Sequence, residues 1–203
     1  MDCCSPRDEH DLASLTAILT HETVNHIRDS AGRIAALNML SAAGGAASAA
    51  LPAVLQTLVV PISIDCGLLL RVAAAEAVWK IGGRRDLALP FLIYALKDEY
   101  WGASLQASQV LSEMRGSASE AVVDLIDLAD RRLSKGPFRF ENFRLNSPPL
   151  LAVVATAIGQ CGRGLERRHE VSDALMRIAT SGDSDVRKAA LNALKSVEGA
   201  DRS

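Results

Sequence analysis

The sequence predicts an all-α fold: an α-solenoid of antiparallel helix pairs, with about ten helices, in a single domain spanning residues 1–203. Two observations lead to this prediction. A thirteen-residue pattern rich in alanine recurs along the chain, and an apolar segment follows it at a fixed distance. A repeat of this length is typical of architectures in which each unit stacks on its neighbours.

The recurring pattern is clearest in "RVAAAEAVWKIGG" (71–83), which aligns without gaps with 33–45, 104–116 and 187–199, and more loosely with 151–163. Small or apolar residues occupy its third, fourth, seventh, eighth and eleventh places. Spacings of three and four put these places on one stripe of a helix. We expect burial between helices for Ala73, Ala74, Ala77, Val78 and Ile81. Small side chains allow neighbouring helices to approach closely, and the closing glycines 45, 83 and 116 end the helices.

A second helix is predicted five to seven residues past each closing glycine, at "ALP" (50–52), "ALP" (88–90) and "AVV" (121–123). Proline is tolerated there because the first helical turn needs no backbone donor. The segment "DLASLTAILTHE" near the start resembles a second helix with no first helix before it. The repeat region therefore covers about residues 12–199.

Residues 70–99, "LRVAAAEAVWKIGGRRDLALPFLIYALKDE", resemble the HEAT-like repeats of the phycobilisome-lyase type, and 185–199 resemble the first half of that repeat. The resemblance implies a HEAT-like or armadillo-type superhelix whose second helices line the concave face. It also implies that the arginines opening the repeats tie neighbouring repeats together, with nearby aspartates as partners. These residues are Arg33, Arg71 and Arg187, with Asp29, Asp183 and Asp185.

Composition and charge favour a cytoplasmic protein without a membrane partner. The formal net charge is −2, no secretory signal opens the chain, and the apolar run 51–62 is too short to span a bilayer.

The four cysteines lack the paired spacing of a zinc or redox site. Cys66 and Cys161 lie among apolar residues, where we expect them to act as small hydrophobic groups.

No catalytic residue, cofactor or metal site is predicted. The segment "HETVNH" places His21 and His26 five residues apart, about 140° around a helix, so one metal ion cannot readily take both. Asp124 and Asp127 share a helix face, but no residue type near them completes a catalytic pair. Nucleophile and phosphate-binding motifs are also absent from the sequence.

Candidate partner-binding residues stand eight and eleven places past the closing glycines, outside the apolar stripe of the second helices. They are Gln56, Phe91, Tyr94, Asp124 and Asp127. Phe91 and Tyr94 are large groups at places where a solvated face would carry Lys or Glu. The alternative is that Phe91 packs on a neighbouring helix.

Residues 133–149, "LSKGPFRFENFRLNSPP", lengthen one repeat, and a loop of this length in a compact stack is usually functional or disordered. The segment 131–168 has a net charge of +6, whereas 1–130 has −7. The binding candidates in the insertion are Lys135, Phe138, Arg139, Phe140, Phe143 and Arg144. The insertion is either a recognition element or a lid whose phenylalanines cover an open edge between repeats.

These observations predict a non-catalytic scaffold that binds another macromolecule, most simply a protein. Two alternatives stay open. The resemblance allows a chaperone-like bilin lyase subunit, with Phe91, Tyr94, Asp124 and Asp127 around the chromophore. Some HEAT-like proteins bind nucleic acid in a basic groove, but the predicted concave positions here are aromatic and acidic, so nucleic acid is disfavoured. The sequence does not indicate the partner's identity or the oligomeric state.

Overall fold

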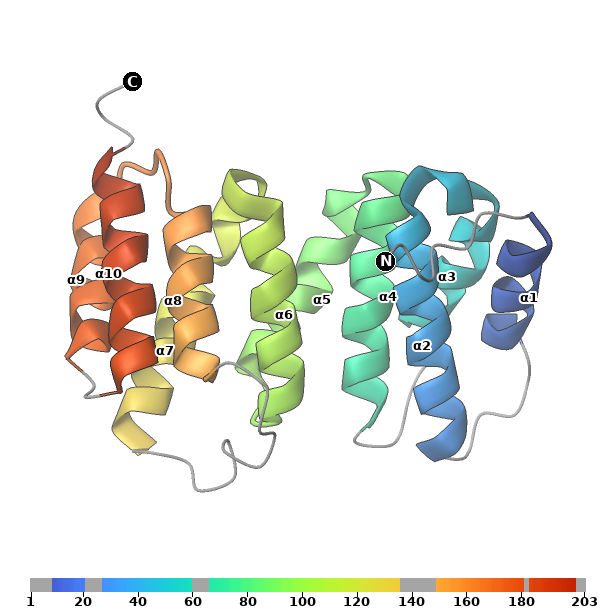
Figure 1. Ribbon diagram of the computed structural model, residues 1–203, viewed down its shortest axis with the longest axis horizontal. Helices are drawn as coiled ribbons and strands as arrows, with labels where there is room; N and C mark the ends of the chain where they lie inside the picture. Colours follow the sequence, from blue (N-terminus) through green and yellow to red (C-terminus); the bar gives the residue numbers. More distant parts are fainter. Residues whose placement is uncertain (1–8, 21–26, 60–65, 136–148, 181–182, 200–203) are drawn as a thin grey trace. The chain divides into compact units, whose positions relative to one another are not determined.

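The computed structural model describes residues 9–20, 27–59, 66–135, 149–180 and 183–199. Throughout these ranges the regular structure is helical and contains no β-strand (Figure 1). The predicted all-α class is therefore confirmed. The chain divides into two compact units, Met1–Leu92 and Ile93–Ser203, with the division falling inside one helix. The prediction of a single repeat domain stays a prediction.

The first unit is built from α1 (Glu9–Thr20), α2 (Ile27–Ala43), the 3₁₀ segment η1 (Gly44–Ala50), α3 (Leu51–Val59), α4 (Cys66–Gly82) and the first part of α5 (Arg85–Lys97). Helix α2 packs against α4, and α3 packs against both α4 and α1. In this unit α2 and α4, and likewise α1 and α3, are therefore neighbours in space.

The second unit holds the end of α5, α6 (Trp101–Met114), the 3₁₀ segment η2 (Arg115–Ala121), α7 (Val122–Lys135), α8 (Leu150–Cys161), α9 (Arg168–Ala179) and α10 (Ser184–Glu198). Helix α8 packs between α6 and α10, and α7 packs against α9. Figure 1 shows α6, α8 and α10 side by side, with α7 and α9 behind them. This unit has two layers of helices.

Burial follows the predicted register. In 71–83, all five predicted places are buried, between 0% and 7% exposed, which confirms that prediction. The same five places in 151–163 are also buried. The fourth place is buried in every repeat: Ala36, Ala74, Ala107, Val154 and Ala190. Alanine and valine at this place allow close helix packing because each adds little bulk.

The first repeat departs from this register. Ala35 and Met39, at its third and seventh places, are exposed, whereas Leu37 and Ser41 are buried. The buried stripe of α2 is therefore turned by one residue toward α4. Within the described residues no first helix precedes α2, so that side of α2 faces solvent rather than another first helix.

Two of the helix ends differ from the prediction by one residue. Gly83 has a φ of 63° as expected, but in the other two repeats the positive φ falls at Gly44 and Arg115, not at the glycines that follow them. Both have a φ of 55°. Arg115 is the one described residue other than glycine with a positive φ, and such a conformation is strained for a residue with a Cβ.

The starts of two second helices are as predicted, since α3 begins at Leu51 and α7 at Val122. Helix α5 is an exception. It begins at Arg85, so Pro90 lies inside the helix and not in its first turn. Asp86 favours this early start because a carboxylate is stabilised near a helix N-terminus. Its hydrogen bonds with the Arg84 guanidinium, at 3.0 and 2.9 Å, lower the pKa of Asp86.

Candidate groove between α8 and α10

Helices α8 and α10 approach each other closely at Gly159. A Cβ added at Gly159 would lie 2.6 Å from the Ala193 Cβ and 2.9 Å from the Ala193 Cα. Carbon atoms in contact normally stand about 3.5–4.0 Å apart. Only glycine therefore fits at this point of α8, and the two helices meet along Gly159 and Ala193.

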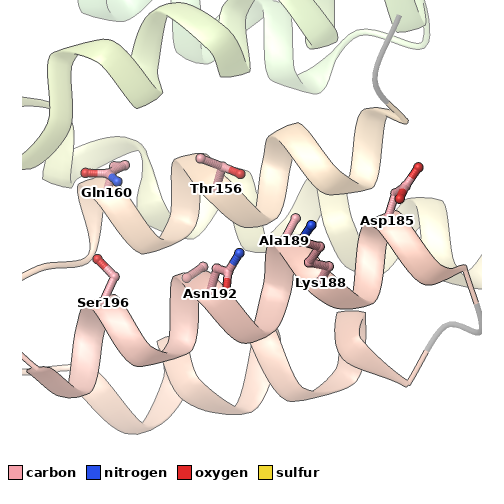
Figure 2. A pocket seen from close by; sticks show the side chains of 8 residues that line it. Thr156, Gln160, Asp185, Lys188, Ala189, Asn192 and Ser196 are labelled. Carbon is pink, nitrogen blue, oxygen red and sulfur yellow. The ribbon is translucent and has the colours of Figure 1, made fainter.

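A groove of about 430 Å³ runs along this pair of helices (Figure 2). Its lining residues are Thr156, Gln160, Asp185, Lys188, Ala189, Asn192, Ala193 and Ser196. Figure 2 shows Gln160 opposite Ser196, Thr156 farther along α8 near Asn192 and Ala189, and Asp185 at the opposite end from Ser196. The alanines of α10 are the small residues of the lining, and the longer side chains are polar.

The polar side chains of the groove have few partners among the described residues. Thr156 Oγ1 donates to the Ala152 carbonyl at 2.9 Å, which leaves its own lone pairs available. Ser196 Oγ accepts hydrogen bonds from Nε of Arg163, at 2.7 Å, and from its Nη2. Within the part of the chain that the structure describes, the side-chain amides of Gln160 and Asn192 make no hydrogen bond.

The groove carries little net charge. Lys188 and Asp185, of opposite sign, are exposed near its end at the start of α10. Arg163 lies beside Ser196 at the other end. Among the described residues, no group of three or more His, Cys, Asp or Glu side chains is placed to hold a metal ion.

Of the predicted partner-binding residues, Gln56 and Phe91 lie in the first unit. Gln56 is exposed on α3, and Phe91 is half-buried on α5. Tyr94 follows Phe91 by three residues on the same helix and is 58% exposed. Spacing of three places the two rings on one side of α5. The structure therefore leaves a large aromatic surface accessible at Tyr94.

Asp124 and Asp127 lie on α7 in the second unit. The side chain of Asp124 is only 19% exposed, and its Oδ1 lies 3.1 Å from Nζ of Lys97. Asp127 is exposed. Asp124 thus joins α7 to the last turn of α5, and this carboxylate already has a cation as its partner.

The first cations of the basic segment also contact the end of α5. Arg131 Nη2 donates to the Leu96 carbonyl at 2.7 Å, and Arg132 Nη2 donates to the Glu99 carbonyl at 3.3 Å. Lys135 Nζ lies 3.0 Å from the Glu99 Oε1, and this hydrogen bond lowers the pKa of Glu99. Cations at a helix C-terminus satisfy its last carbonyls and oppose its dipole.

The other candidates of the insertion lie outside the described residues. They are Phe138, Arg139, Phe140, Phe143 and Arg144. The choice between a recognition element and a lid stays open. His21 and His26 lie outside the described residues as well.

The sequence carries a signal for the groove in its repeat alignment, outside any catalytic or binding motif. Thr156 and Asn192 stand at the sixth place of their repeats, and Gln160 and Ser196 at the tenth. These places flank the buried stripe on the side of its third place, and in both repeats they hold uncharged hydrogen-bonding groups. Equal places in stacked repeats lie side by side, so the repeat alignment alone would bring these four together.

One helical run, Ser30–Val59, is long and apolar enough to cross a membrane by length and composition alone. The core helices of soluble proteins pass the same test, and this run is not one regular helix. It turns at Gly44 and has non-helical dihedral angles at Ala47. The run is therefore weak evidence for a membrane span.

Comparison of the chain with protein-family models, with curated proteins and with solved structures finds no match.

Proposed function

We propose that this chain is a non-catalytic HEAT-like solenoid that binds another protein, and that the groove between α8 and α10 is one of its contact surfaces. The solenoid is supported by the full burial register that 71–83 and 151–163 share, by the buried fourth place in all five repeats, and by the packing of α8 between α6 and α10. Stacked repeats of this kind present long surfaces suited to macromolecular partners.

The groove is the observation that carries the proposal. It is open, it follows most of the length of α10, and polar side chains from two helices line it. Pockets for small molecules are mostly apolar and enclose their ligand. A groove for nucleic acid needs several cations along its length, whereas this one has Lys188 and Asp185 of opposite sign. A protein is the ligand class that fits best.

The positions suggested for a bilin chromophore are less suited to it. Asp124, which holds the same place in its repeat as Phe91, is paired with Lys97 at 3.1 Å. The nucleic-acid alternative also loses support, because Arg131, Arg132 and Lys135 are bonded to α5 and Glu99. Cytoplasmic localisation remains part of the proposal.

Affinity purification from a cell extract, at physiological salt, tests the proposal. The bait is used intact, as Gln160→Ala/Asn192→Ala, and with residues 135–145 replaced by a Gly/Ser linker. Asn38→Ala is the matched control, since Asn38 is exposed and holds the same place in its repeat as Asn192. We expect one protein to bind the purified intact chain directly and stoichiometrically. Loss with the groove variant but not with the control locates its site.

Two outcomes contradict the proposal. If no protein binds the intact chain directly, the scaffold function fails. If a partner binds the intact chain and the groove variant equally, the groove is not the contact surface. Loss of binding only with the replaced insertion would assign recognition to that segment.

A further inference from the structure

We infer that the groove between α8 and α10 binds an extended peptide segment of the partner, chiefly through the main chain of that segment. This inference rests on the proposed protein-binding function and specifies what the groove recognises. It follows from three properties of the groove: the chemistry of its side chains, their spacing, and the shape of its floor.

The groove offers donors and acceptors in nearly equal supply. The side-chain amides of Gln160 and Asn192 each carry one carbonyl acceptor and two N–H donors. A peptide group carries one acceptor and one donor, so each amide can both donate to it and accept from it. Thr156 adds acceptor lone pairs, because its hydroxyl proton is bonded to the Ala152 carbonyl. An extended main chain presents N–H and C=O groups alternately, so these side chains can pair with it whatever its sequence.

The spacing of these groups matches an extended chain. Lys188, Asn192 and Ser196 are four residues apart on α10, and Thr156 and Gln160 are four apart on α8. Four helical residues rise about 6 Å. Two residues of an extended strand rise about 6.6 Å. Over the two steps from Lys188 to Ser196 the mismatch stays near 1 Å, which flexible side chains absorb. Each helix can therefore contact every second peptide group.

The floor of the groove disfavours other protein ligands. Ala189 is half-buried and Ala193 is buried against Gly159, and among the described residues no large apolar side chain lines the groove. A helical ligand needs an apolar groove for its anchor residues. Lys188 and Asp185 give the groove one charge of each sign, so a strongly acidic or basic peptide gains little. A main chain lying between the two rows of polar side chains is the occupant that these features favour.

A peptide library tests the inference with the full chain. Random 12-residue peptides displayed on phage are selected against the intact protein, and the tightest are synthesised for fluorescence-anisotropy titration. We expect binding that Gln160→Ala/Asn192→Ala weakens at least tenfold and that Asn38→Ala leaves unchanged. Far-UV circular dichroism and thermal unfolding check that the variants remain folded. Affinity should change less than threefold between 50 and 300 mM NaCl.

The decisive measurement is a scan in which each peptide nitrogen in turn is methylated, which removes its donor. Main-chain recognition predicts losses of fivefold or more at alternate residues. Uniformly small losses, or losses confined to consecutive residues, would overturn the inference and leave protein binding intact. Failure to select any peptide that depends on Gln160 and Asn192 would also overturn it. If affinity purification then still yields a direct partner, the proposed function stands without this binding mode; if it does not, both fail.

Discussion

Replacing Gly159 by alanine sets two effects of known size against each other. In a helix interior, alanine is favoured over glycine by about 1 kcal/mol. At Gly159, however, the new Cβ would lie 2.6 Å from the Ala193 Cβ and 2.9 Å from its Cα. Overpacking of a well-packed contact costs about 1–3 kcal/mol. Because the second clash is with backbone, no side-chain rotation relieves it, and the cost should lie in the upper half of that range.

We therefore expect Gly159→Ala to lower the free energy of unfolding of the second unit by about 1–2 kcal/mol, the overpacking cost less the helix gain. Urea unfolding followed by fluorescence measures this. Each unit contains one tryptophan, Trp79 in the first and Trp101 in the second. A Trp79→Phe background makes the signal report on the second unit alone, and far-UV circular dichroism gives the total.

Gly32 is the matched control. It lies inside α2, and no described heavy atom lies within 4 Å of a Cβ added there. Gly32→Ala should thus raise stability by about 0.5–1 kcal/mol, the helix preference alone. Ala193→Gly should recover part of the loss in the Gly159→Ala protein, since it removes the nearer clash. A rise in stability for Gly159→Ala similar to that for Gly32→Ala would refute the close approach of α8 and α10.

Three further predictions concern single positions. Ala74→Leu adds bulk at a residue with 0% exposure and should cost about 1–3 kcal/mol in chemical denaturation; an unchanged midpoint would contradict the repeat register. Arg115→Gly should stabilise the second unit by about 1 kcal/mol because it relieves a φ of 55°, whereas Arg115→Ala should not. Cys161 is fully buried, its thiol donates to the Leu111 carbonyl at 3.2 Å, and burial raises its pKa to about 12. The stability that the neutral Cys161 thiol contributes is complete below pH 9 and is lost as the pH rises from 9 toward 12, because only the unfolded thiol ionises in that range. In a chain whose other cysteines are replaced by serine, alkylation of Cys161 at pH 8 should proceed only as fast as the protein unfolds. Rapid labelling of the folded protein would contradict the burial of Cys161.

The buried half of this fold could be read from the sequence. For the groove, the repeat alignment brings the four polar residues together but does not show that they line a binding surface. A buried stripe excludes most residue types, so the spacing of Ala73, Ala74, Ala77 and their neighbours predicts one helix face. Outward places accept the same polar residues whether they meet water or a ligand. Asn192 and Asn38 hold equal places in their repeats, yet only the structure shows that Asn192 lines the groove.

Local geometry accounts for the other differences. The position of Pro90 suggested the first turn of a helix, but proline also fits an exposed interior position where one backbone bond is lost. The glycine pairs marked where helices end without showing which glycine carries the positive φ. In the repeat at 104–116 an arginine takes that place, which no rule of sequence composition predicts.

The 3₁₀ segment η1 recurs 71 residues later in the chain as η2. Gly44, Ala47 and Ala50 in η1 correspond to Arg115, Ala118 and Ala121 in η2, and both segments have their one non-helical residue at the middle alanine. Between them, the turn at Gly83 is shorter and contains no such segment. Two junctions between successive helices, 71 residues apart in the sequence, therefore share one local geometry. Excising residues 45–115 would join Gly44 directly to Gly116 and keep that geometry, so the sequence between the two segments can be removed without a new type of junction.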